Sequence, residues 1–292
     1  EDEPFLSENA NALDQALEAT LMTASQGQGL HYFELPEDGL YEEIPQDPLN
    51  PITHDKVVLG RLLYHETGIA LAPMQPIGKE TYSCASCHFA DAGFQADRWQ
   101  GIGDGGAGAG LTRLMDGHYD AEQLDVQPIR SPTTLNVAYQ TNMLWNGQFG
   151  ATGVNVGTEA QWTEDTPKEN NHLGFEGVET QAIAGLEVHR QVIDMEALDQ
   201  YGYRQLFDRA FPQLPSGERY TRESAGLAIA AYERTLLANR APFQLWIKGY
   251  RDAMTERQKR GAILFFDKAG CGECHTGPAL NSMAFYGYGM DD

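Results

Sequence analysis

Residues 83–94, SCASCHFADAGF, and residues 271–280, CGECHTGPAL, decide how this chain is interpreted. Each stretch contains two cysteines three positions apart, and a histidine directly follows the second cysteine. The chain has four cysteines, and all four lie in these two stretches. No cysteine is therefore left for the disulfide framework that many small secreted proteins use.

The pattern Cys-x-x-Cys-His is the attachment signature of c-type haem. Two thiols at this spacing can bond to the two vinyl groups of one porphyrin, and the adjacent histidine supplies an axial nitrogen to the iron. Two Cys-x-x-Cys pairs with two histidines could also share one zinc ion, but the Cys-His adjacency in both copies favours haem. The sequence predicts two covalently bound haem c groups. Their attachment and iron-ligating residues are Cys84, Cys87 and His88 for the first and Cys271, Cys274 and His275 for the second.

The amino-acid composition limits the kinds of molecule that the chain is expected to bind. The chain has 292 residues with a formal net charge of −22, which argues against binding to nucleic acids or anionic membranes. The negative charge would attract a basic partner protein, or it only keeps the chain soluble. No apolar run reaches the length of about 18 residues that a transmembrane helix needs. Since the chain opens with Glu1-Asp2-Glu3 and thioether attachment takes place outside the cytoplasm, we expect a periplasmic or extracellular protein whose signal peptide has been removed.

Most of the regular structure is predicted to be α-helical. A helix is expected over residues 10–24, and a second runs from an N-cap at Thr53 to about Tyr64. Apolar residues between 225 and 236 recur at helical spacing on one face. Thr255 and Gln258 form a capping box ahead of a further helix. No segment has the pattern of a long strand.

Two long segments are predicted to be irregular. Residues 101–110, GIGDGGAGAG, contain a Gly-x-Gly-x-x-Gly pattern, but no strand-like segment precedes it, which argues against a dinucleotide site. Residues 146–180 are polar and rich in turn residues, as expected for a surface insertion. Residues 60–66 and 261–267 share the pattern G-x-[LI]-L-[YF]-x-[ED] ahead of the two cysteine motifs, which indicates two similar haem-binding units.

Several segments resemble, in order, the bacterial dihaem cytochrome c peroxidases and their relative MauG. The resemblance covers roughly residues 45–290. The matching segments are IPQDPLNPITHDKVVLGRLLYHE (44–66), TYSCASCHFADAGF (81–94), IRSPTTLNVAYQTNMLWNGQFG (129–150), AIAAYERTLLANRAPFQLW (228–246) and KRGAILFFDKAGCGECHTGPAL (259–280).

The resemblance implies a mainly α-helical fold with two cytochrome-c-like haem domains packed face to face. The expected parts are an acidic N-terminal arm (1–50), a peroxidatic haem domain with a long loop insertion (51–215) and an electron-transfer haem domain (216–292). The last domain is expected to be incomplete, because the chain ends seventeen residues after His275 and Met283 and Met290 come too early for the family's distal ligand. Another chain completing this domain is one option.

Two side chains receive roles from the resemblance. Trp145 matches a tryptophan of the electron path between the haems, or it is a buried residue that anchors the domain interface. Glu187, in TQAIAGLEVHRQ, is the nearest match to the family's distal glutamate, which would move a proton from one peroxide oxygen to the other. The alternative for Glu187 is a solvated charge on a helix. His189 and Arg190 stand close enough in sequence to share the pocket.

The distal side of the first haem departs from the family pattern. Many members have a capping histidine where this chain has Asp104, sixteen residues after His88. Either His118 caps the iron or the iron is open, and a solvated His118 is the preferred interpretation. A calcium ion at the domain interface is an option in the family, although Ser131 stands in the place of the usual asparagine ligand.

Three functions follow, in descending order of preference. The first is reduction of hydrogen peroxide to water, with electrons from a small basic donor, a cytochrome c or a cupredoxin, passing from the C-terminal to the N-terminal haem. The second is oxidation of a residue on a partner protein, as in MauG. The third is electron transfer without substrate chemistry.

Overall fold

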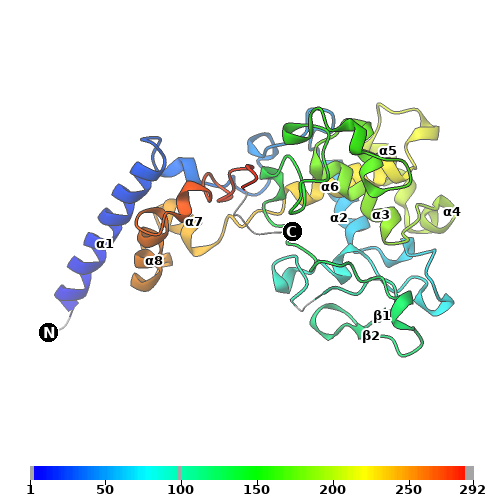
Figure 1. The fold of residues 1–292 in the computed structure, drawn as a ribbon, viewed down its shortest axis with the longest axis horizontal. Helices are drawn as coiled ribbons and strands as arrows, with labels where there is room; N and C mark the ends of the chain where they lie inside the picture. The colour runs from blue at the N-terminus through cyan, green and yellow to red at the C-terminus, as the bar shows by residue number, and fades with distance from the viewer. Residues whose placement is uncertain (1–2, 98–99, 287–292) are drawn as a thin grey trace. The chain divides into compact units, whose positions relative to one another are not determined.

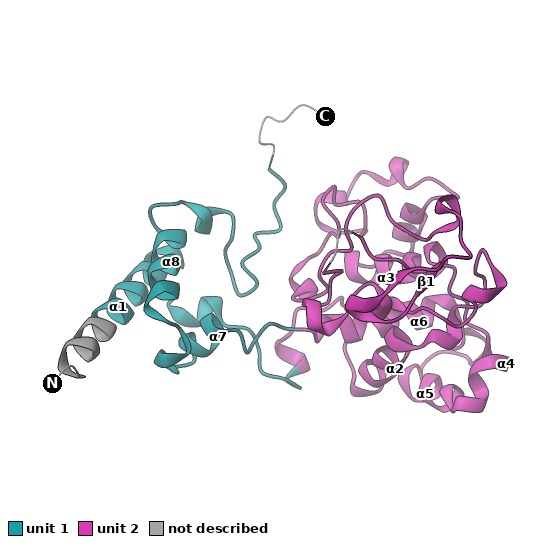
Figure 2. Cartoon of the chain, turned by 90° about the horizontal axis from the view of Figure 1, so that it is seen from below, with its two compact units in different colours: residues 1–40, 237–292 teal, residues 41–236 magenta. Residues whose placement is uncertain are grey.

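The computed structural model describes residues 3–97 and 100–286. The chain divides into two compact units, of which one contains residues 1–40 together with 237–292 and the other contains residues 41–236 (Figure 2). We call them unit 1 and unit 2. The predicted boundaries lay instead at residues 50 and 215. Residues 216–236 fall in unit 2 because their helix packs against helices of that unit.

Unit 2 is built on three helices, α2 (His54–His65), α3 (Gly177–Val188) and α6 (Arg222–Arg234), of which α6 packs against both α2 and α3 (Figure 1). The Thr53 side chain accepts a hydrogen bond from the Lys56 backbone N–H, which confirms the predicted N-cap of α2. The shorter helices α4 (Met195–Leu198) and α5 (Tyr203–Ala210) lie beside this core.

Glycine allows α2 and α6 to approach closely. A Cβ atom added to Gly60 would lie 1.8 Å from the Ala228 carbonyl oxygen, so this position admits no side chain. Gly226 makes a similar approach to Ile183 of α3, where a Cβ atom would meet backbone atoms at 2.7–2.8 Å. The helices therefore meet backbone to backbone at these points, which fixes how deeply they interlock.

A buried ion pair joins α6 to α3. Arg234 is fully buried, and its Nε and Nη2 donate to the two carboxylate oxygens of the equally buried Glu179 at 2.8 and 2.6 Å. Arg234 also donates to the Glu176 carboxylate at 2.9 Å and to the Pro45 carbonyl at 3.1 Å. Because every donor group of this guanidinium has an acceptor, the buried charge is compensated.

Between residues 66 and 175 the helical structure consists of short 3₁₀ turns joined by irregular segments, and this range includes residues 101–110, which were predicted to be irregular. The two strands that the structure describes, β1 (Gly106–Ala107) and β2 (Leu114–Met115), form an antiparallel hairpin in the glycine-rich region. Buried Arg113 donates to the carbonyls of Ile102 and Gly103, both at 2.7 Å, so this region is an internally bonded loop. Residues 146–180 are less superficial than expected, since Asn171 is fully buried and bridges Gln148 and Gly150.

Unit 1 joins the two ends of the chain. Its helices are α1 (Glu3–Ala24), α7 (Pro242–Ile247) and α8 (Glu256–Phe266). The predicted first helix is therefore longer than residues 10–24, and it packs against α8 in a compact unit. Within this unit, Asp14 of α1 accepts hydrogen bonds from Trp246 Nε1 at 2.6 Å and from Lys259 Nζ at 2.7 Å. The predicted capping box of Thr255 and Gln258 is confirmed at the start of α8.

Among the helices of residues 3–97 and 100–286, none combines the length and the apolarity required to cross a membrane.

Candidate haem-attachment sites

The first cysteine motif forms a tight, internally bonded turn. Residues Cys84–Ser86 make a 3₁₀ turn, and the side chains of Ser83 and Ser86 cap it reciprocally. The His88 backbone N–H donates to the Cys84 carbonyl at 3.0 Å, and the Tyr64 hydroxyl donates to the His88 carbonyl at 3.0 Å. Helix α2, through Tyr64, therefore fixes the motif against the core.

The His88 imidazole is oriented by backbone carbonyls. Its Nδ1 lies 2.9 Å from the Pro132 oxygen and 3.3 Å from the Phe94 oxygen, both of which can only accept, so Nδ1 carries the hydrogen. Nε2 is then the nitrogen with a free lone pair, as a metal ligand requires. Burial lowers the pKa of His88 to about 4, which keeps the ring neutral at pH 7.

A cavity of about 440 Å³ opens beside this motif in unit 2, and Cys84, Cys87 and His88 all line it. Burial raises the pKa of the Cys84 thiol above its ordinary range and that of Cys87 to about 12, so both sulfurs stay as thiols. The volume lies in the range of cofactor sites, roughly 300–1,000 Å³. Two thiols and one oriented imidazole on the wall of a single cavity fit a covalently attached haem.

Trp145 borders the same cavity but lies at the surface of its unit. Its side chain is 94% exposed, and it follows Leu144, which has a positive φ of 71°. Trp145 is therefore not a core residue of unit 2. Its predicted place in an electron path stays a prediction.

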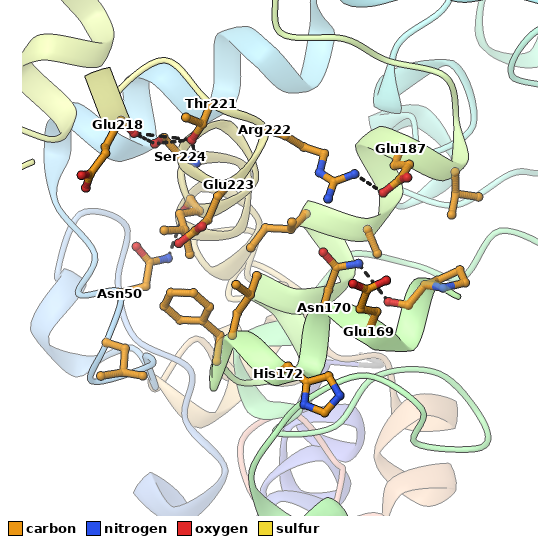
Figure 3. A pocket seen from close by; sticks show the side chains of 18 of the residues that line it. Asn50, Glu169, Asn170, His172, Glu187, Glu218, Thr221, Arg222, Glu223 and Ser224 are labelled. Carbon is orange, nitrogen blue, oxygen red and sulfur yellow. Dashed lines mark hydrogen bonds and ion pairs between the residues drawn. The ribbon is translucent and has the colours of Figure 1, made fainter. Parts of the chain in front are cut away.

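Glu187 does not line the His88 cavity, so its predicted position at the first haem is corrected. The α3 residues that do line it include Gln181, Gly185 and Val188, which recur at helical spacing. Glu187 falls on another face of α3, where its carboxylate pairs with Arg222 and its side chain is 64% exposed (Figure 3). It borders a separate hollow of about 1,210 Å³, as the solvated alternative had implied.

His118, the candidate cap of the first haem, and Asp104, which stands in place of the family's histidine, both have other partners. His118 does not line the cavity; its side chain is 73% exposed, and Nδ1 lies 2.7 Å from the Asp116 carboxylate. Asp104 is fully buried, and it accepts hydrogen bonds from the Tyr119 hydroxyl at 2.6 Å and from Arg190 at 3.3 Å. Arg190, which the sequence placed near the pocket, thus pins the glycine-rich loop.

Three further ionisable side chains line the cavity, of which only His189 was expected near the pocket from the sequence. His189 is hydrogen-bonded through Nδ1 to Oδ2 of Asp125 at 2.7 Å. Glu233, in the last turn of α6, is only 5% exposed, and burial raises its pKa to about 8. A signal for Glu233 existed, because it stands four positions after Ile229 on the predicted apolar face. The Asp125–His189 pair joins residues far apart in sequence and had no such signal.

The second motif repeats the local geometry of the first. Residues Cys271–Glu273 form a 3₁₀ turn, the His275 backbone N–H donates to the Cys271 carbonyl at 2.9 Å, and His275 Nδ1 lies 3.1 Å from the Leu280 carbonyl. This histidine is therefore also held with Nε2 free. Met283 belongs to the described chain, whereas Met290 lies outside it.

Within residues 3–97 and 100–286, no group of three or more His, Cys, Asp or Glu side chains is arranged to hold a metal ion. The calcium ion that the resemblance allows stays a prediction.

Comparisons with known proteins agree with this geometry. The model of the family described as di-haem cytochrome c peroxidase matches residues 54–252. The methylamine utilization protein MauG of Methylorubrum extorquens is 27% identical over 250 residues, which cover 85% of this chain and 57% of that protein. The cytochrome c peroxidase Ccp of Escherichia coli is 29% identical over 250 residues, which cover 84% of this chain and 43% of that protein.

A crystal structure of a MauG-like protein associated with microbial copper homeostasis shares the fold, with a TM-score of 0.50 and 21% identity over 87% of this chain and 61% of that one. The chain thus spans about half the length of these curated relatives. Since the family model matches more than half of the residues, the chain belongs to the di-haem cytochrome c peroxidase family.

Proposed function

We propose that this chain carries one haem c at each cysteine motif and reduces hydrogen peroxide at the first. The observation that carries the proposal is the His88 site, where an imidazole with Nε2 free stands at the wall of a cavity lined by both attachment thiols. Haem, when bound there, supplies the redox chemistry, which is the two-electron reduction of peroxide to water. Cys84 and Cys87 hold the group, and His88 is its axial ligand.

The route of the electrons is part of the proposal. His275 would ligate the second haem, a small donor protein would supply the electrons, and Trp145 would lie on their path toward the first haem. The exposed indole at the cavity edge supports this role, because electrons that enter the cavity at that edge meet an aromatic side chain. The net charge of −22 supports a basic donor, a cytochrome c or a cupredoxin. Attachment of haem c supports a periplasmic or extracellular location.

A second function, oxidation of a residue on a partner protein, is favoured by one observation. The Trp145 side chain is almost fully exposed while it borders the His88 cavity, so oxidising equivalents could reach a partner at the surface. Relatives named MauG carry the same family resemblance. The two functions differ in their electron source, which is a donor protein in one case and the oxidised partner in the other.

The test uses the full chain, matured with haem in a bacterial periplasm. Optical and EPR spectra of the oxidised and half-reduced protein are recorded before and after addition of peroxide. Two variants separate the sites: His88→Met alters the ligand of the first haem, and His275→Met alters that of the second. We expect two haems per chain, and peroxide-dependent spectral changes that His88→Met abolishes and His275→Met leaves in place. Two low-spin haems that ignore peroxide in every redox state would leave electron transfer as the function.

A further inference from the structure

His189 and the buried Asp125 form a hydrogen-bonded pair at the cavity of the first haem. His189 caps the C-terminus of α3, and its Nδ1 lies 2.7 Å from Asp125 Oδ2. Asp125 follows the glycine-rich loop in sequence and is joined to it by backbone hydrogen bonds with Gly103 and Asp104, and its side chain is 3% exposed. Gln127 donates to the other carboxylate oxygen at 3.0 Å. These contacts therefore hold the Asp125 carboxylate against the His189 imidazole.

The pair has a defined protonation pattern. Burial raises the pKa of Asp125, but the hydrogen bond and charge of His189 together with Gln127 outweigh it, so the pKa lies below its ordinary value and the carboxylate is ionised. A carboxylate can only accept, so Nδ1 of His189 carries a hydrogen. Nε2 is then the ring nitrogen whose lone pair can take up and release a proton.

The other ionisable groups on the cavity wall are less suited to this task. Tyr82 has a pKa raised by burial, and the two cysteines are thiols destined for attachment. Glu233 keeps its proton at pH 7 and is a poor base. Glu187 lies outside the cavity. Among the described residues that line it, His189 combines partial exposure with an imidazole held by a buried carboxylate.

We propose that His189, oriented by Asp125, is the acid–base residue of the first haem's cavity, an inference that rests on the proposed function. Nε2 of His189 accepts a proton from one peroxide oxygen and donates it to the other, so that the O–O bond breaks and the second oxygen leaves as water. Two electrons from the reduced donor and two protons from solvent convert the remaining oxygen into a second water. Asp125 is a positioning residue, because it acts through the imidazole.

The experiment compares His189→Gln, Asp125→Asn and the control Glu187→Gln in the haem-loaded full chain. Stopped-flow spectroscopy gives the second-order rate constants for peroxide and, separately, for cyanide between pH 5 and 9. Hydrogen cyanide must also lose a proton when it binds a haem, so the cyanide rate reports the same base without any turnover. Resting EPR spectra and haem content are measured for each variant.

We expect His189→Gln to lower both rate constants about 10²- to 10⁴-fold and to remove their pH dependence near neutrality. Asp125→Asn should lower them less and move the midpoint of the pH profile downward, because an anion that favours the imidazolium is lost. Glu187→Gln should stay within about twofold of the natural chain, as expected for a residue outside the cavity.

Equal rates and pH profiles for His189→Gln and the natural chain, at unchanged haem content, would overturn the inference. A low-spin first haem that becomes high-spin in His189→Gln would also overturn it, because His189 would then be an iron ligand. A natural chain that ignores peroxide but binds cyanide through a step lost in His189→Gln would refute the proposed function and support the base. A first haem that binds neither molecule would refute both.

Discussion

Replacing Glu233 by glutamine is expected to stabilise the folded chain increasingly as the pH rises from 4.5 to 8. Glu233 is 5% exposed, and burial raises its pKa from the ordinary 4.5 to about 8, with the Glu179 charge adding to the effect and Arg234 opposing it. Between these two pH values the unfolded chain has released this proton while the folded chain retains it. The folded state binds more protons, so its stability falls as the pH rises.

The size of the effect follows from the same shift. Each pKa unit corresponds to about 1.4 kcal/mol, so the shift of Glu233 costs the natural chain roughly 5 kcal/mol at pH 8 relative to pH 4.5, as an upper limit. Glutamine keeps the shape of the protonated acid and does not titrate. The difference in unfolding free energy between the variant and the natural chain should therefore grow with pH by several kcal/mol.

Urea unfolding of the haem-loaded protein, followed by far-UV circular dichroism at pH 5, 6, 7 and 8, measures this difference. Glu187→Gln is the matched control, since its carboxylate is exposed and its change in stability should stay within about 0.5 kcal/mol at each pH. A stability difference for Glu233→Gln that is constant from pH 5 to pH 8 would show that Glu233 does not titrate in this range. The argument from its burial would then fail.

Three further sets of substitutions test the packing. Glu179→Gln removes the fully buried one of the two carboxylates that pair with Arg234 and should cost about 3–5 kcal/mol of unfolding free energy, whereas the double variant with Arg234→Met should recover part of that loss. Gly60→Ala should lower the melting temperature sharply, because its Cβ would meet the Ala228 carbonyl, whereas Gly261→Ala has open space and should gain up to about 1 kcal/mol. Asp14→Asn should expose the α1 connection to limited proteolysis at neutral pH, since Asp14 joins α1 to Trp246 and Lys259.

Each of these predictions has an opposing result. An additive double variant at Glu179 and Arg234 would mean that the two side chains are not coupled. Equal melting temperatures for the two glycine variants would contradict the close approach of α2 and α6. The pKa of Asp14 is lowered: burial raises it, and the hydrogen bonds from Lys259 and Trp246 outweigh that effect. Its contribution to stability should therefore be lost as the pH falls through this pKa, so protease sensitivity that ignores acidification would refute the role.

Features that depend on neighbouring residues could be predicted from the sequence. The cysteine motifs, the Thr53 N-cap and the capping box of Thr255 and Gln258 each involve groups within a few positions, and the structure has them. Glu187 was predicted to lie in the site because of its position along the segment TQAIAGLEVHRQ. The helical rotation of α3 carries its side chain to another face, and order alone does not encode this rotation.

Features that depend on distant segments could not be predicted. The Asp125–His189 pair joins a glycine-rich loop to the end of a helix, and no periodicity or motif relates the two residues. The acidic residues and prolines of residues 1–50 predicted an N-terminal arm. In the structure, however, Leu17 and Leu21 of α1 are buried in one hydrophobic core with Trp246. The sequence of an amphipathic helix does not specify which other helix it packs against.

The make-up of unit 1 from both ends of the chain has a consequence for the order of folding. Helix α1 is synthesised before α8, and the two helices can pack together only after residues 41–236 have been made. In unit 2 the Arg234 side chain bonds the Pro45 carbonyl, and in unit 1 Asn239 bonds the Pro36 carbonyl at 2.8 Å. Folding of unit 2 thus brings the two connecting segments together and removes most of the loop-closure entropy that separates α1 from α8. Unit 1 should therefore fold last and depend kinetically on unit 2, which would act as its template.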